Sequence, residues 1–364
     1  MARRNSSTTD NRRNGPSNEE YLALYEWAGQ LRAAEPWKTL GSGDVIGVRD
    51  PETGVIGYCG VMGQLGEYLA LHVYLGGAGI EAYTTIVEAG APDDDPACEP
   101  SQMNIMLAGR SQINLVVEFC DVAEVGPRDK ARAKALGLSY LGNNVWPVFL
   151  RNDPCLEPRD LDAWEVRFLT VAIQQILLVA DRVRNSELEI PEMFMTDQVF
   201  VRVPENSDGV LVWKDAVEAL ETAPVPESDP LSESDLLSLE RLPVRKFYLE
   251  LAHTIMPAVV KVHASDRGMY TRMFIAVDGR TGKVLGFHTF DLREFPGAVL
   301  KQVAALLTTL GFIPSQLVVN DLWLFAAIGN AVPVLRNSLG LSNRMDASED
   351  AVAALAGFMQ GQHR

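Results

Sequence analysis

Three acids in the C-terminal third of the chain, Asp278, Asp321 and Glu349, have the residue types and order that could support catalysis. Asp278 ends one apolar run, Asp321 follows another, and Glu349 opens a later segment with helical periodicity. Ribonuclease-H-like nucleases place acids in this order, because two divalent metal ions must bracket a phosphate. One hypothesis is therefore a metal-dependent phosphodiesterase or nuclease-like enzyme with a ribonuclease-H-like C-terminal domain.

Each of these acids also fits an ordinary structural role. Asp278 begins the tight turn 278–282, Asp321 can cap a helix over 322–328, and Glu349 suits the positive end of a final helix. The net charge of -16 also opposes a phosphate substrate. We favour the structural roles, so the sequence assigns no catalytic, cofactor-binding or metal-binding residue, and Asp278, Asp321 and Glu349 stay a second choice.

The remaining residues with reactive side chains show no motif. The five histidines form no HxH or HxxxH pair, the four cysteines form no CxxC pair, and the glycines and serines form no phosphate loop, GxGxxG or GxSxG pattern. These are His72, His253, His263, His288 and His363, and Cys59, Cys98, Cys120 and Cys155. We expect strand or surface histidines, buried thiols and no cofactor.

Composition excludes several classes of protein. Apolar residues make up 47% of the 364 residues and charged residues 22%, which is typical of a globular protein. The acidic balance disfavours binding to nucleic acid or anionic lipid. No apolar segment follows the basic first residues, and the most apolar stretch, 168–183, is interrupted by polar residues. We expect a cytoplasmic protein with no membrane segment.

The pattern of apolar and turn residues predicts an α+β fold with two mixed domains. A capping box, Ser17 with Glu20, predicts a helix that ends before Pro36. Further segments are predicted by their periodicity. The strands are 44–50, 55–61, 68–75, 113–119, 146–150, 199–203, 210–213, 247–251, 259–262, 273–278, 283–290 and 316–319, and the helices are 80–88, 128–136, 161–184 with Pro158 near its first turn, 296–310 and one from 348.

A shift in composition divides these segments. Residues 217–240 hold several acids, no base and three prolines, which predicts a linker over 217–235. The predicted parts are a disordered basic arm over 1–17, an N-terminal α+β domain over 18–216 and a C-terminal α/β domain over 236–364. In the second, a βαβ-like order predicts a small sheet in which 273–278 and 316–319 run parallel.

Several local motifs together resemble a known family. They are Leu24-Tyr-Glu, Pro36-Trp, Gly47-Val-Arg-Asp-Pro-Glu-Thr-Gly, Gly57-Tyr, Val61-Met-Gly, the strand 71–76, Asn144-Val-Trp-Pro and Glu165-Val-Arg-Phe-Leu. The chain is similar to an uncharacterised bacterial two-domain family known only as domains of unknown function, and residues 270–360 resemble the second domain. The resemblance implies a bacterial cytoplasmic origin and the two-domain division, and it implies no activity.

The leading hypothesis is a non-catalytic intracellular interaction or regulatory protein, whose acidic body suits a basic protein partner. The metal-dependent enzyme is the first alternative. A second alternative is an acidic mimic of nucleic acid, which requires contiguous surface carboxylates. The partner and the oligomeric state are not determined by the sequence.

Overall fold

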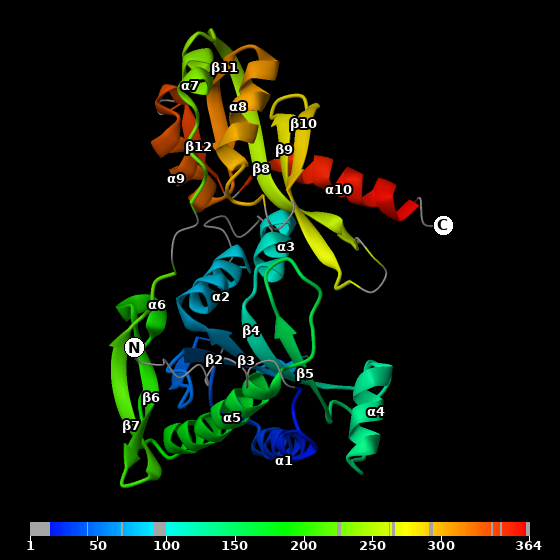
Figure 1. Ribbon diagram of the computed structural model, residues 1–364, viewed down its shortest axis with the longest axis vertical. Helices are drawn as coiled ribbons and strands as arrows, with labels where there is room; N and C mark the ends of the chain where they lie inside the picture. The colour runs from blue at the N-terminus through cyan, green and yellow to red at the C-terminus, as the bar shows by residue number, and fades with distance from the viewer. Residues whose placement is uncertain are drawn as a thin grey trace, which may run out of the picture. The chain divides into compact units, whose positions relative to one another are not determined.

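A computed structural model describes residues 15–41, 43–66, 68–90, 100–223, 227–261, 263, 266–290, 294–335, 338–342 and 344–361. The described residues form two compact units (Figure 1). The first unit draws on Met1–Tyr83, Gln112–Asp153 and Pro158–Ala223, and the second on Thr84–Ser111, Pro154–Glu157 and Pro224–Arg364. Both combine a mixed sheet with helices, which confirms the predicted α+β class.

The first unit contains a seven-stranded sheet in the order β5-β4-β3-β2-β1-β6-β7. Neighbouring strands are antiparallel except β1 and β6, which are parallel. The strands are β1 Ile46–Arg49, β2 Ile56–Met62, β3 Leu69–Leu75, β4 Asn114–Cys120, β5 Trp146–Asn152, β6 Gln198–Ser207 and β7 Val210–Ala219. The helical segments are α1 Asn18–Ala34, η1 Pro36–Lys38, α4 Pro127–Ala135, α5 Ala163–Arg184 and α6 Met193–Thr196. The helix α2, Gly76–Gly90, begins in this unit, and its residues from Thr84 are counted with the second.

Two capped helices, α1 and α5, build the main core of this unit. The predicted capping box of Ser17 and Glu20 is present at α1. A second box, formed by Asp162 and Glu165, starts α5 at Ala163, two residues later than predicted, and Pro158 lies in the segment before it. The buried side of α5 packs on the sheet together with α1. By length and composition α5 could cross a membrane, but 61% of its most apolar window is buried inside the fold.

The second unit contains a five-stranded sheet in the order β10-β9-β8-β11-β12. Its strands are β8 Val244–Val260, β9 Met269–Asp278, β10 Val284–Phe290, β11 Ile313–Val319 and β12 Leu339–Leu341. Its helical segments are α3 Gln102–Arg110, α7 Glu233–Glu240, α8 Val299–Leu310, α9 Leu322–Ala331, η2 Pro333–Leu335 and α10 Asp346–Gly361. One face of the sheet packs with α8 and α9, and the other packs with α3 and α10.

The second sheet corrects two predictions. The segment 247–251 and the first two residues of the segment 259–262 belong to one strand, β8, because the pairing with β9 continues beyond a register shift between Ile255 and Val259. The predicted parallel pairing of 273–278 with 316–319 is wrong: β8 lies between them, parallel to β11 and antiparallel to β9. The sequence also gave no signal for α3, which contacts β8 although it lies within the predicted N-terminal domain.

The ends of the predicted linker are regular structure. β7 continues to Ala219, and α7 begins at Glu233 with Ser232 as its cap. Residues 1–14, which make up most of the predicted basic arm, and residues 224–226 of the linker lie outside the described residues.

Candidate functional site

Asp278 and Asp321 lie at different positions along the strand direction of the second sheet. Asp278 accepts hydrogen bonds from the Arg280 N–H at 3.0 Å and from the Thr281 hydroxyl at 2.8 Å, as a turn residue does. It pairs with Leu249 of β8, whereas Asp321 contacts His253, four residues further along that strand. Four residues of strand correspond to about 13 Å.

Glu349 lies on the other side of the same sheet. Its helix, α10, packs on the face of β8 that carries Glu250, and Glu250 accepts hydrogen bonds from the Ser348 N–H and hydroxyl, both at 2.8 Å. His253 and its partner Asp321 belong to the opposite face, because side chains alternate along a strand. The three acids do not converge, and among the described residues no group of three or more His, Cys, Asp or Glu side chains could hold a metal ion.

Asp321 instead belongs to a buried cluster with His253 and Arg272. His253 Nδ1 lies 2.7 Å from Asp321 Oδ2, and its Nε2 lies 3.3 Å from Arg272 Nη1. The imidazole is only 1% exposed; it stacks on Phe295 and meets Phe274 edge-on. Arg272 also lies over the Phe295 ring, with its guanidinium carbon 4.5 Å from the ring centroid. Each member of the cluster is therefore fixed by more than one contact.

The charges of the cluster determine how its protons are arranged. Burial lowers the pKa of His253, and Asp321 only partly opposes that effect. For Asp321 burial is the largest effect and acts to raise the pKa, but the interactions with His253, the Leu324 N–H and Arg272 together outweigh it, and the pKa lies below its ordinary value. A neutral His253 therefore donates Nδ1–H to the Asp321 carboxylate and accepts at Nε2 from Arg272.

The pair of His253 and Asp321 resembles the histidine and aspartate of a catalytic triad, but His253 Nε2 faces an arginine where a triad has its nucleophile. A triad histidine takes a proton from a nucleophile through Nε2, whereas here a permanently charged guanidinium occupies that nitrogen. Asn320 fixes the backbone around His253, accepting from its N–H at 2.8 Å and donating to its C=O at 2.9 Å. The geometry holds β8, β9 and the start of α9 together; it does not present a base to a substrate.

A second polar chain crosses three strands of the first unit. Asn152 donates to Asn114 Oδ1 at 2.8 Å, Asn114 Nδ2 lies 3.2 Å from His72 Nδ1, and His72 Nε2 lies 3.1 Å from the Tyr68 hydroxyl. Tyr68 in turn donates to Glu118 Oε2 at 3.1 Å. Burial lowers the pKa of His72 to about 4, so the ring is neutral at physiological pH. Both ring nitrogens of His72 have protein partners.

The other residues considered from the sequence show little sign of chemistry. Cys59 and Cys155 are buried, as expected, and burial raises the pKa of each thiol. Cys120 is only partly buried. His263 is exposed, and Cys98 and His363 lie outside the described residues.

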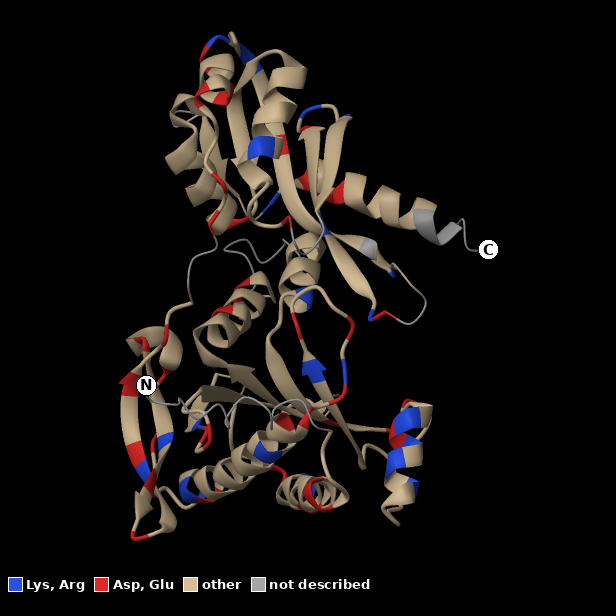
Figure 2. Ribbon diagram, in the orientation of Figure 1, with Lys and Arg blue, Asp and Glu red and all other residues tan. Residues whose placement is uncertain are grey.

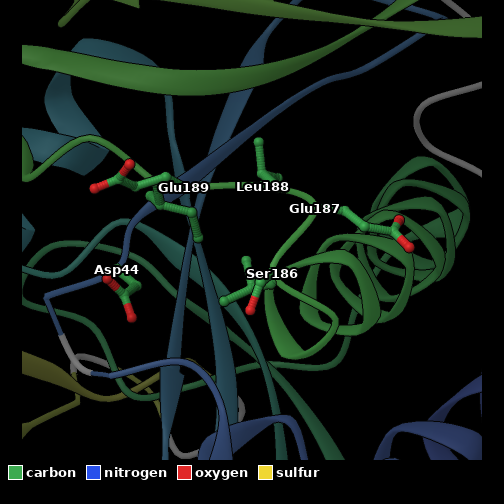
Figure 3. A pocket seen from close by; sticks show the side chains of 7 residues that line it. Asp44, Ser186, Glu187, Leu188 and Glu189 are labelled. Atoms are coloured by element: carbon green, nitrogen blue, oxygen red, sulfur yellow. The ribbon is translucent and has the colours of Figure 1, made fainter.

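A shallow hollow adjoins the C-terminal end of α5 in the first unit (Figure 3). Its volume is about 520 Å³, and it is lined by Asp44 and by residues that follow α5, including Glu187 and Glu189. Figure 3 shows that the three carboxylates point in different directions. They do not converge on one point, as a cation site requires.

The edge strand β7 of the first unit is mostly exposed. It pairs with β6 on one side only. Its apolar side chains are nevertheless exposed: Val210 by 63%, Leu211 by 48% and Val217 by 54%. Unpaired edges with apolar side chains are templates for pairing with another chain.

The backbone of β7 shows which groups are available for pairing. The Leu220 N–H donates to the Asp197 C=O at 3.1 Å, on the side of β6. Because peptide groups alternate along an antiparallel strand, the N–H groups of Leu211, Trp213 and Val217 point away from β6. The strand therefore presents a row of outward donors and acceptors beside its exposed apolar side chains.

The sequence analysis missed most of these residues, though a signal for some was present. Tyr68, Asn114 and Glu118 are polar residues within or beside apolar strand patterns, at positions that alternate to one face. The exposed side chains of β7 looked like ordinary strand residues, because a sequence does not show which strand is at an edge. Arg272 carried no signal.

Comparison with known proteins identifies two families, and neither family has a described function. Residues 21–202 match the family model of a domain of unknown function (DUF7309), and residues 235–356 match that of a second domain of unknown function (DUF6930). No curated protein and no solved structure matches the chain.

Proposed function

Since the chain belongs to the DUF7309 family, whose description names no activity, we propose from its own surfaces that it is a non-catalytic interaction protein. In this proposal an extended segment of a partner protein adds to the sheet of the first unit along β7. Strand addition of this kind gains affinity from main-chain hydrogen bonds and specificity from alternate side chains.

The exposed edge of β7 is the observation that carries the proposal. The strand is ten residues long, which offers several hydrogen bonds to a partner strand. Soluble proteins usually protect such edges with charges, proline or a covering segment. β7 does carry charged residues, but they are in ion pairs with neighbouring side chains. Val210, Leu211 and Val217 are exposed beside them, and their burial by a partner would remove apolar surface from water.

The charges of the β6–β7 hairpin and of the whole chain indicate the chemistry of the partner. The hairpin carries acids at Glu205, Asp208, Asp215 and Glu218 and bases at Arg202 and Lys214. Asp215 and Glu218 are in ion pairs with arginines, and Glu205 pairs with Lys214. These pairs leave the hairpin close to neutral, but the whole chain carries a net charge of -16, which favours a partner segment in which apolar residues alternate with lysine or arginine.

Selection from a library of ten-residue peptides displayed on phage tests the proposal. We expect enrichment of sequences that alternate apolar and basic residues. Val217→Pro removes an outward N–H without removing a hydrogen bond to β6, so it should abolish binding of the selected peptides. Val217→Thr keeps the N–H and is the matched control. Failure to enrich, or binding that Val217→Pro leaves intact, would contradict the proposal.

The two alternatives have less support. The nuclease-like enzyme requires Asp278, Asp321 and Glu349 to share metal ions, and they lie apart. The acidic mimic requires contiguous carboxylates, whereas Figure 2 shows Asp and Glu interspersed with Lys and Arg. Many of those acids form ion pairs, for example Glu20 and Glu52 with Arg167.

The proposal includes a bacterial cytoplasmic location. It is supported by the three described cysteines, which form no disulfide and suit a reducing compartment. The bacterial origin rests on the family resemblance of the sequence. Fractionation of a bacterium that expresses the chain tests the location, and recovery in the membrane or periplasmic fraction would contradict it.

A further inference from the structure

A pocket of about 260 Å³ lies in the second unit between α8 and the edge strand β10. Leu251, Phe274 and Ala276 of the sheet contribute to its apolar surface, and Val303 and Leu306 of α8 face them. All five side chains belong to the apolar core of this unit or pack against it. The pocket is thus an opening of the apolar core between one helix and the sheet edge.

The pocket exists because small residues lie where larger ones would fill it. Gly286 of β10 has no side chain that could fill the pocket, and Ala305 of α8 lines the margin of the pocket with only a methyl group. A Cβ atom at Gly286 would meet only Leu306, at 3.5 Å, which is ordinary van der Waals contact. The backbone therefore has room for a larger residue at position 286, and the glycine leaves that room open.

Two polar side chains line this apolar pocket without protein partners. Neither the His288 ring nor the Gln302 amide makes a hydrogen bond to any residue that the structure describes. His288 lies against the Phe290 ring, with the centroids 4.6 Å apart, and both polar side chains are half-buried. Partly buried polar groups usually find partners, so these two are available to a ligand.

One positively charged side chain, Lys301, lies on the helix that lines the pocket. Lys301 is the only charged residue of α8, and it precedes Ala305 by four residues, which places both on one side of the helix. It forms no ion pair within the described part of the chain. A flexible ammonium group near apolar walls suits a ligand with an anionic group.

We propose that this pocket binds a small carboxylic acid with an aromatic or branched aliphatic body. The apolar body contacts Leu251, Phe274 and Leu306, and the carboxylate accepts hydrogen bonds from His288 and Gln302 with Lys301 nearby. The site lies in the second unit and uses no residue of β7, so it goes beyond the proposed interaction function and can fail independently of it.

Calorimetric titration of the full chain with phenylacetate tests the proposal. We expect saturable binding that Gly286→Val weakens by about tenfold or more, because the added methyl groups occupy the pocket. Gly340→Val is the matched control: Gly340 lies on strand β12 of the same sheet, and a Cβ there meets Val318 at 3.7 Å. This control should bind like the wild type.

A second variant keeps the test decisive if Gly286→Val does not fold. Gln302→Leu keeps the size of the side chain and removes the amide, and it should weaken phenylacetate binding by about three- to tenfold. The same variant should leave the weaker binding of the uncharged probe toluene unchanged. Absence of saturable binding to phenylacetate, or binding that neither variant alters, would overturn the proposal.

Discussion

His253 and Asp321 join two elements that are 68 residues apart in the sequence. The imidazole Nδ1 lies 2.7 Å from the Asp321 carboxylate, and the other carboxylate oxygen accepts the Leu324 N–H in the first turn of α9 at 3.1 Å. One side chain thus caps a helix and holds a buried ring of the central strand β8. The same carboxylate that could be taken for a metal ligand is a connection between strand and helix.

Replacement of Asp321 by alanine should therefore remove two interactions at once. The cap is worth about 1 kcal/mol, and leaving the buried Nδ1–H of the neutral His253 without an acceptor costs about 1–3 kcal/mol. We expect Asp321→Ala to lower the free energy of unfolding of the second unit by about 2–4 kcal/mol, measured by urea titration of the full chain.

Ser232→Ala is a suitable comparison for Asp321→Ala. Ser232 caps the exposed helix α7 and contacts no histidine. Its loss should cost about 1 kcal/mol. Equal effects of the two substitutions would show that the contact between Asp321 and His253 adds no stability.

Local motifs of the sequence predicted local structure well. The capping box of Ser17 and Glu20 and the turn that starts at Asp278 both appear as expected, because their hydrogen bonds join residues only two or three positions apart. Thr281 donates its hydroxyl to Asp278, and Thr53 donates to Asp50 in a similar turn between β1 and β2. The two turns thus share the same chemistry.

Long-range pairing was not predictable in the same way. The parallel partner of β11 is β8, which begins almost seventy residues earlier, and nothing in the apolar pattern distinguishes it from β9. The same limit applies to the cluster of His253, Asp321 and Arg272, whose members come from three separate elements. Asp321 was recognised from the sequence, but its partners depend on the order of strands in the sheet.

The pH dependence of stability should depend on His72. Its folded pKa of about 4 lies below the ordinary value near 6.5, because burial disfavours the charged ring. Below about pH 6.5 the unfolded state therefore binds a proton that the folded state does not, and stability falls as the pH drops toward 4. The loss approaches about 1.4 kcal/mol per pH unit.

His72→Gln isolates this contribution. At pH 7 we expect the variant to be less stable than the wild type, since it loses the contacts of the ring with Tyr68 and Asn114. Between pH 6.5 and pH 4 the difference in stability between the two proteins should shrink. Only the wild type has a histidine at position 72 that binds a proton in the unfolded state and not in the folded state. Urea unfolding of both proteins at several pH values measures it; parallel stability curves would contradict the assignment.

Glu250 and Ser348 should hold α10 on the second sheet. Glu250 is buried and accepts both the N–H and the hydroxyl of Ser348. Ser348→Ala removes the hydroxyl, and hydrogen bonds to charged groups contribute about 1.5–3 kcal/mol. We expect a loss of about 2 kcal/mol in urea unfolding. Ser238→Ala, on the exposed helix α7, should change stability by less than about 0.5 kcal/mol; a similar loss in both would refute the special role of Ser348.

Two glycines of the first unit should respond to alanine in opposite ways. A Cβ at Gly57 on β2 would lie 2.5 Å from the Val73 side chain and 2.8 Å from the Phe168 ring of α5, so α5 and β3 must move to admit it. Overpacking of this kind costs about 1–3 kcal/mol. Gly29 lies on the exposed side of α1 with no atom within 4 Å of the added Cβ, and alanine there should gain about 0.5–1 kcal/mol through its helix propensity. Thermal unfolding should therefore show a lower Tm for Gly57→Ala and a higher Tm for Gly29→Ala. An unchanged or higher Tm for Gly57→Ala would show that α5 does not pack on β2 as closely as described, and a lower Tm for Gly29→Ala would contradict the open space at that position.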